Sequence, residues 1–146
     1  MALDDPLKKM SKSSTSTGSY IALTDSADEI SRKIKRAVTD SGSDIRASAD
    51  KPAITNLLTI HSLLSGMSIP DLEAHFSGKG YGALKSEVAE VIVDTLRPVQ
   101  ERMHELSEDP EQTMAILAAG AERARTRARP KMELVRDRMG LEIGSA

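Results

Sequence analysis

Apolar side chains recur every three or four residues along most of the chain, which is the spacing of one face of an α-helix. The first such helix is predicted after Ser26, because Ser26 and Glu29 have the spacing of a capping box. Its apolar face consists of Ile30, Ile34 and Val38. Serine, aspartate and glycine follow, which predicts a loop.

A second helix is predicted to open at Asp50 and Pro52 and to close at Gly66. Its apolar residues are Ile54, Leu57, Leu58, His61 and Leu64, widened by Ile60 and Leu63. So broad a stripe indicates a central, largely buried helix. A short third helix is expected from Ser68 to about Phe76.

A long fourth helix is predicted after a glycine-rich turn at residues 78–82. Its apolar face is Leu84, Val88, Val91, Ile92, Thr95, Val99, Met103 and Leu106. Pro98 should kink this helix, because proline lacks an amide donor and crowds the preceding turn. A fifth helix should begin at Asp109, bend or break at Pro130 and end at Gly140. Methionines 103, 114, 132 and 139 are expected to fill the core.

The predicted fold is all-α, an irregular helical bundle with a flexible N-terminal loop, because no stretch alternates convincingly with a period of two. The loop is expected over roughly the first twenty residues. They contain Lys8, Lys9 and Lys12, followed by a hydroxyl-rich stretch with Gly18. Two tyrosines and one phenylalanine are the only aromatic residues, so an aliphatic core of packed helices is favoured.

Composition narrows the chemistry. The 146 residues fit one domain and include no cysteine, which excludes disulfides, thiol nucleophiles and thiolate metal sites. No structural metal is expected, since the three histidines are scattered: His61 should be a packed histidine with one satisfied nitrogen, and His75 and His104 should be at the surface.

No apolar run approaches the roughly 20 residues that span a bilayer, and no signal-peptide stretch is seen, so a cytoplasmic location without membrane contact is expected.

The sharpest local signal is the pentapeptide Lys9, Met10, Ser11, Lys12, Ser13. Two ammonium groups three residues apart on a pliable loop can close on a polyphosphate and neutralise its oxygens. The serines add hydroxyl and backbone donors. A solvated, lysine-rich tail is the alternative interpretation of the pentapeptide alone.

Residues 9–13 spell KMSKS, the second signature of class I aminoacyl-tRNA synthetases, and the whole chain resembles the tryptophanyl-tRNA synthetase family in order. The matching segments are residues 3–6, 33–40, 56–60, 80–82 with Lys85, 96–98, 120–125 and 139–141. Gly78-x-Gly80-x-Gly82 is interpreted as a turn, since it lacks the spacing of the dinucleotide fingerprint.

The resemblance implies a ligase in which tryptophan attacks the α-phosphate of ATP, which is accompanied by magnesium, and the tryptophanyl group then passes to tRNA. Lys9 and Lys12 would be the catalytic residues, stabilising the pentavalent phosphate and the departing pyrophosphate. ATP binding would fall to Lys9, Met10, Ser11, Lys12 and Ser13. Residues 1–24 would be the catalytic loop segment and residues 25–146 the C-terminal helical domain that binds tRNA and its anticodon.

The family's nucleotide-binding half is not recognisable in this sequence. A HIGH-type motif on a Rossmann sheet is absent, and the family also builds its tryptophan pocket and dimer contacts in that half. The chain is therefore expected to be the C-terminal portion, with the N-terminal Rossmann half as its missing partner. On its own, the chain should be inactive, should not bind ATP tightly and should not form the family's homodimer. Met1 and Ala2, directly before residues 3–6, suggest a truncated protein or a short gene product.

Two basic clusters are candidates for tRNA contact. One is Arg32, Lys33, Lys35 and Arg36, and the other is Arg123, Arg125, Arg127 and Arg129, extended by Lys131, Arg136 and Arg138. Such side chains can follow an RNA backbone through its phosphates, although the formal net charge of −2 gives no overall attraction. A solvated helix with internal ion pairs is the alternative. For the whole chain, a stand-alone RNA-binding or regulatory module and a structural helical adaptor also stay open.

Overall fold

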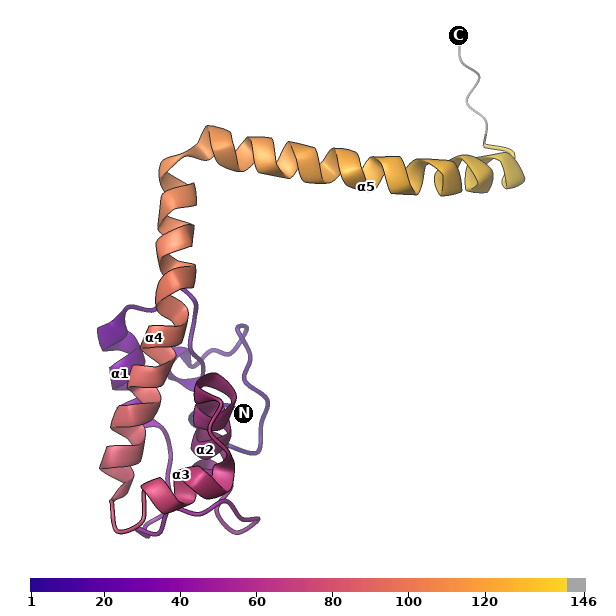
Figure 1. Cartoon of the computed structure of the whole chain (residues 1–146). Coiled ribbons are helices and arrows are strands. Elements are labelled where there is room, and N and C mark those ends of the chain that lie inside the picture. Colours follow the sequence, from indigo (N-terminus) through magenta and orange to yellow (C-terminus); the bar gives the residue numbers. More distant parts are fainter. Residues whose placement is uncertain (142–146) are drawn as a thin grey trace. The chain divides into compact units, whose positions relative to one another are not determined.

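The computed structural model describes residues 1–141, and in that part it contains five α-helices, one 3-10 helix and no strand (Figure 1). The all-α prediction is confirmed. The elements are η1 (Thr17–Ser19), α1 (Ala27–Arg36), α2 (Pro52–Ser65), α3 (Ile69–His75), α4 (Tyr81–Glu108) and α5 (Pro110–Arg138). The chain divides into two compact units, Met1–Glu101 and a second that starts at Arg102.

The helix starts follow the predicted local chemistry. In α1, the Glu29 amide donates to Ser26 Oγ at 3.3 Å, and the Ser26 amide donates to the Glu29 carboxylate at 2.8 Å. This reciprocal capping box satisfies two donors that have no partner within the helix. Gly66, at φ +77°, ends α2 in the left-handed conformation that glycine adopts without steric cost.

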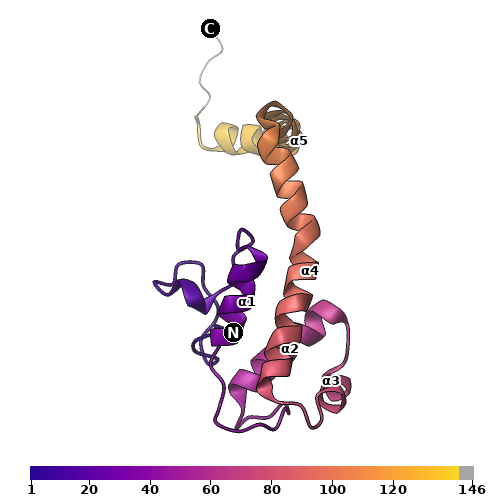
Figure 2. The same ribbon diagram turned by 90° about the vertical axis from the view of Figure 1, so that its left-hand side faces the viewer.

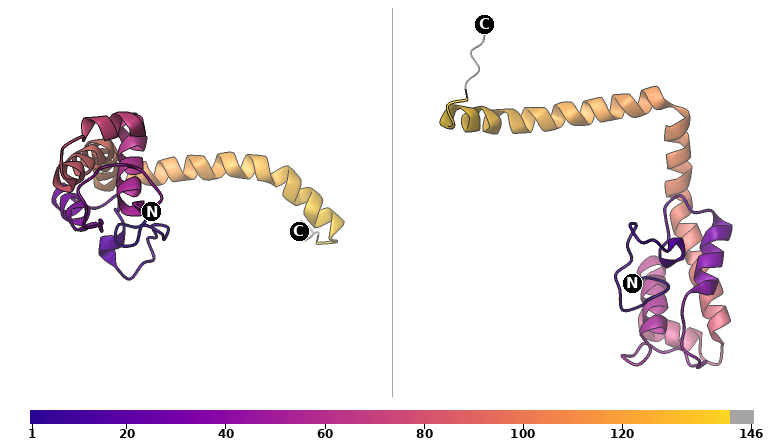
Figure 3. Two further views of the ribbon diagram at one scale, coloured as in Figure 1. Left: turned by 90° about the horizontal axis from the view of Figure 1, so that it is seen from below. Right: turned by 180° about the vertical axis from the view of Figure 1, so that it is seen from behind.

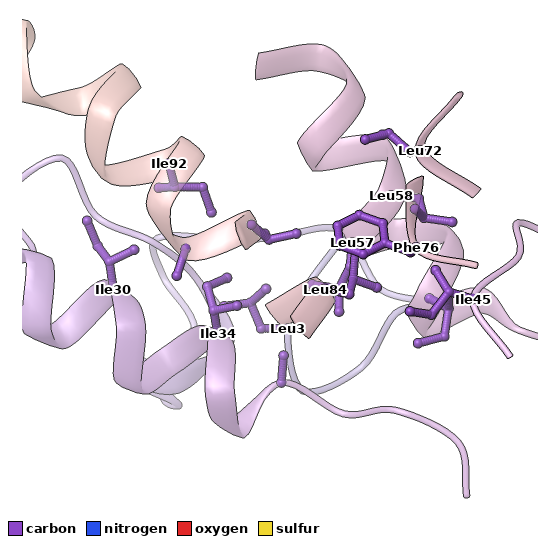
Figure 4. Close-up of a cluster of buried hydrophobic side chains, with 14 residues drawn as sticks. Leu3, Ile30, Ile34, Ile45, Leu57, Leu58, Leu72, Phe76, Leu84 and Ile92 are labelled. Atoms are coloured by element: carbon purple, nitrogen blue, oxygen red, sulfur yellow. The ribbon is translucent and has the colours of Figure 1, made fainter. Parts of the chain in front are cut away.

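The core of the first unit gathers aliphatic side chains from α1, α2, α3 and α4 together with Phe76 (Figure 4). Leu3 and Ile45, from segments outside the helices, complete it. The Met1 amino group hydrogen-bonds to Asn56 on α2, and Figures 2 and 3 show the amino terminus beside the helices of the first unit. The predicted loop segment is therefore built into the helical core at its beginning.

Several residues predicted to be apolar contacts are exposed instead. Val38 is 47% exposed, because α1 ends at Arg36 and the backbone of Ala37 turns to an extended conformation; Ala37 is buried in its place. In α2, Leu63 is 79% exposed, so the buried stripe is narrower than predicted. Val99 is also exposed, which limits the buried part of α4 to its first half.

The helix α5 has no buried residue. Met114, Met132 and Met139 are exposed, as is Met103 in α4, so the prediction that they fill the core is wrong for this chain. Neither Pro98 nor Pro130 ends its helix. A proline removes only one bond of the helical ladder, and the bonds on either side continue the helix.

Glu87 on α4 links two histidines, one on α2 and one on α3. His61 on α2 is 1% exposed, and its ring nitrogens lie 3.1 Å from Ser65 Oγ and 3.2 Å from Glu87 Oε1 on α4. Its packed position was predicted, but both nitrogens have partners. The other Glu87 oxygen lies 2.9 Å from Nε2 of His75, which is exposed as predicted, like His104. Glu87 therefore bridges two imidazoles.

Candidate functional site

The KMSKS residues lie on a loop whose two ends are tied together by backbone hydrogen bonds. The Leu3 amide donates to the Ser19 carbonyl at 2.9 Å, and the Val38 amide donates to the Leu3 carbonyl at 2.8 Å. The Leu3 side chain is 3% exposed and belongs to the core. We call residues 4–18 the lysine loop and residues 1–3 with Ser19 its stem.

The side chain of Asn56, on α2, holds the stem. Its Oδ1 accepts a 2.8 Å hydrogen bond from the Met1 amino group, and its Nδ2 donates to the carbonyls of Met1 and Ala2, at 3.2 and 3.5 Å. Asn56 is only 9% exposed. A polar side chain at a buried position of α2 thus finds its partners in the stem backbone, as buried amides require.

Within the lysine loop, Lys8 forms an ion pair, whereas the motif lysines Lys9 and Lys12 form none with any of residues 1–141. Lys8 Nζ lies 2.9 Å from the Asp5 carboxylate, and this hydrogen bond raises the pKa of Lys8 and lowers the pKa of Asp5. Lys9 and Lys12 are exposed and form no ion pair within residues 1–141. Their charges are therefore available to an external anion.

The rest of the motif forms a turn. The Ser13 amide donates to Ser11 Oγ at 3.3 Å, and the Ser14 amide donates to the Ser11 carbonyl at 3.2 Å. Met10 is half-buried against the hydrophobic core. A concavity in the loop brings Lys9, Ser11 and Ser13 together, while Met10 and Lys12 are not among its lining residues. It is also lined by Ala2, Asp4, Asp5, Lys8, Ser14, Thr15, Ser16 and Ser19.

The basic cluster on α1 separates into a surface part and an internal part. Arg32, Lys35 and Arg36 are exposed, three and four residues apart, so they share one face. Lys33 is different: its Nζ lies 2.6 Å from the Asp25 carboxylate, and its side chain is only 16% exposed. Lys33 therefore contributes to packing of the first unit rather than to an exposed cationic face.

The arginines of α5 are all exposed, but they do not share a face. A helix turns by about 100° per residue, so alternate positions lie on nearly opposite sides. Arg123 and Arg127 form one pair and Arg125 and Arg129 the other. Arg125 also lies 3.4 Å from the Glu122 carboxylate.

Two residues that support the site went unrecognised as functional from sequence. Lys85 on α4 donates from its Nζ to the carbonyls of Ala37 and Lys35, at 2.7 and 3.3 Å, where α1 ends; burial lowers the pKa of Lys85. Asn56 is the other. Asn56 belongs to one of the segments that resemble the family, and it is an amide within an otherwise apolar run, but its partners lie more than 50 residues away and have no local signature.

The sequence profile of the family described as "tRNA synthetases class I (W and Y)" matches residues 1–97. The chain belongs to this synthetase family. It is 46% identical over 142 residues to the tryptophan–tRNA ligase of Bacillus subtilis and 48% identical over 142 residues to that of Halalkalibacterium halodurans. Each match covers 97% of this chain and 43% of the relative's length.

A solved structure agrees with the sequence relatives. The tryptophanyl-tRNA synthetase from Mycoplasma pneumoniae superposes with a TM-score of 0.83 at 37% identity, covering 97% of this chain and 43% of that one. The predicted kinship with tryptophanyl-tRNA synthetases is confirmed. The chain spans less than half the length of these relatives.

Among residues 1–141, no three histidine, aspartate or glutamate side chains are grouped so that they could hold a metal ion. In the same part of the chain, no helix has the length and apolar character needed to cross a membrane.

Proposed function

We propose that this chain is the C-terminal part of a tryptophan–tRNA ligase and supplies its ATP-phosphate loop and its tRNA-facing helical domain. The main support is the lysine loop, in which Lys9 and Lys12 are exposed and form no ion pair with any of residues 1–141, while the loop's ends are fixed to the core. Two lysines that form no ion pair within residues 1–141, carried by an anchored loop, can bind the negative oxygens of a polyphosphate. Residues 1–24 form the catalytic segment, and the helical domain starts at residue 25.

Lys9 and Lys12 act through charge, not through acid–base chemistry. When tryptophan attacks the α-phosphate of ATP, negative charge moves toward the departing pyrophosphate, and ammonium groups held nearby stabilise that change. Ser11 and Ser13 add donors beside Lys9. Magnesium enters with ATP as part of the substrate, so it makes no demand on a metal site in this chain.

The partner required for catalysis is the remainder of the ligase, which would hold the adenine, ribose and tryptophan. The chain alone is expected to bind ATP weakly and to show no tryptophan-dependent exchange between ATP and pyrophosphate. Clear exchange by the rigorously purified chain would overturn this division of labour.

A chimaera tests the proposal. This chain would replace the matching 43% of the Bacillus subtilis ligase. The chimaera is expected to catalyse exchange, and Lys12→Ala in it should lower the exchange rate with little change in tryptophan binding, because the charge acts on the transition state. Lys8→Ala is the matched control, since Lys8 is paired with Asp5. Equal rates for Lys12→Ala and the parent chimaera would remove Lys12 from its role, and a folded but inactive chimaera would favour a non-catalytic module.

The tRNA contact is proposed on the exposed cations alone. Arg32, Lys35 and Arg36 on α1 form one candidate face, and Lys33 is left out because Asp25 holds it. On α5, Arg123 with Arg127 and Arg125 with Arg129 form two further candidates. Their affinity for tRNA would be electrostatic and would fall as salt rises, because each neutralised phosphate releases counterions.

A further inference from the structure

We infer that Asn56 is a positioning residue for Lys9 and Lys12, acting through the stem of the lysine loop. The inference rests on the phosphate-binding role proposed for that loop. Asn56 lies on α2, far from the motif in sequence, and its side chain hydrogen-bonds to the backbone of the stem at Met1 and Ala2.

Both the oxygen and the nitrogen of the Asn56 side-chain amide form hydrogen bonds to the stem. Its oxygen accepts from Met1 N, while its nitrogen donates to the carbonyls of Met1 and Ala2. Only a side chain with a donor and an acceptor of this size satisfies all three groups. Leucine, which is of similar size but has no polar atom, would leave all three groups without this partner.

From the stem, the constraint passes directly to the motif. The Ala2 carbonyl accepts from Asn56, and the Ala2 amide donates a 2.8 Å hydrogen bond to the carbonyl of Lys8. That carbonyl belongs to the peptide group whose nitrogen is the Lys9 amide. The Asn56 amide is thus two hydrogen bonds from the Lys9 backbone, and buried Ala2 is the single link between them.

Such a link matters because charge stabilises a transition state only when it is held in place. Without the Asn56 amide, Lys9 and Lys12 keep their charges but the loop samples other positions. The expected result is a slower chemical step with unchanged tryptophan affinity.

The first experiment measures loop mobility in this chain. The sequence has no cysteine, so Leu7→Cys, at a side chain 77% exposed, accepts a single nitroxide label beside Lys8. In electron paramagnetic resonance spectra, Asn56→Ala and Asn56→Leu should both raise the mobile fraction several-fold, because neither side chain can hydrogen-bond to the stem. Thr59→Ala is the control, because its hydroxyl bonds only to the Thr55 carbonyl within α2. Spectra of both Asn56 variants that match the parent would overturn the inference.

The second experiment separates positioning from the function of the loop itself. In the chimaera, Asn56→Ala should lower the exchange rate by about tenfold with tryptophan KM unchanged, and should add little to Lys12→Ala, since both act on one interaction. If Lys12→Ala slows exchange and Asn56→Ala does not, the positioning inference fails while the proposed function stands. If Lys12→Ala has no effect, the proposed function fails, and the mobility result still reports whether Asn56 holds the loop.

Discussion

Lys85 Nζ donates a 2.7 Å hydrogen bond to the carbonyl of Ala37, the residue that follows the last turn of α1. The final carbonyls of a helix have no partner within it, and a cation there also offsets the negative end of the helix dipole. The next residue, Val38, donates to the Leu3 carbonyl in the loop stem. One lysine on α4 therefore closes α1 at the point where α1 meets the stem.

Replacing Lys85 with methionine should lower the free energy of unfolding of the first unit by about 1–2 kcal/mol, because two carbonyls lose their donor while the aliphatic stem remains. Urea denaturation followed by circular dichroism measures this. Lys35→Met serves as the control, since its side chain is exposed on α1. Identical midpoints for the two variants would show that water replaces Lys85 without loss.

Stability should fall in acid through Glu87. Burial raises the pKa of this carboxyl, but hydrogen bonds from His75 and His61 together outweigh it, so the pKa of Glu87 lies below its usual value of 4.5. A carboxyl with a lowered folded-state pKa stabilises the fold above its unfolded pKa, and that stability is lost as pH falls through the folded value.

The change that isolates this effect is Glu87→Gln. Urea midpoints measured from about pH 5 down to about pH 3 should decline less steeply in Glu87→Gln than in the parent. The exposed Glu90, on the same helix, provides Glu90→Gln as a control that keeps the parent's slope. A slope for Glu87→Gln that equals the parent's would assign the acid sensitivity to other groups.

A side chain at position 42 should displace neighbouring polar side chains. A Cβ there would lie 2.8 Å from Asp40 Oδ1 and 3.3 Å from the Tyr81 hydroxyl, which itself donates to Asp40 at 2.7 Å. Gly42→Ala is therefore expected to cost about 1 kcal/mol of unfolding free energy, because these side-chain ends must move and their hydrogen bond is weakened. At Gly80 an added Cβ meets nothing within 4 Å, so Gly80→Ala is the comparison in thermal unfolding. Equal losses of stability for Gly42→Ala and Gly80→Ala would mean that the backbone freedom of glycine, and not steric crowding, causes the loss.

If α5 contacts tRNA, its two arginine pairs should contribute unequally. A straight RNA backbone can follow only one side of a helix, and Arg123 with Arg127 lies nearly opposite Arg125 with Arg129. Filter binding over a salt series compares the two double glutamine variants. One should weaken binding and flatten the salt dependence, with helical circular dichroism retained. The absence of binding at low salt, or two variants that behave like the parent, would end the proposed role of α5.

Much of the fold was predictable because its signals are local. A capping box such as Ser26 with Glu29 spans a single helical turn, so both partners are visible in the sequence, and glycine at position 66 marks a helix end for the same reason. The KMSKS pentapeptide is likewise a run of consecutive residues, so the whole motif is visible in the sequence. Helix positions, the all-α class and the synthetase kinship therefore followed from short stretches read in order.

Contacts between distant segments were decided only by tertiary packing. Asn56 finds Met1 and Ala2 across more than 50 residues, and Lys85 finds Ala37 across 48. Helical periodicity predicts that a residue is on an inner or outer face, but not which backbone group it meets there. Lys33 illustrates the consequence, since its cationic cluster predicted an RNA contact and its ion pair with Asp25 turned it inward. The sequence alone determined the helices and the KMSKS pentapeptide, whereas the side chains that hydrogen-bond to the loop stem depend on how separate helices pack.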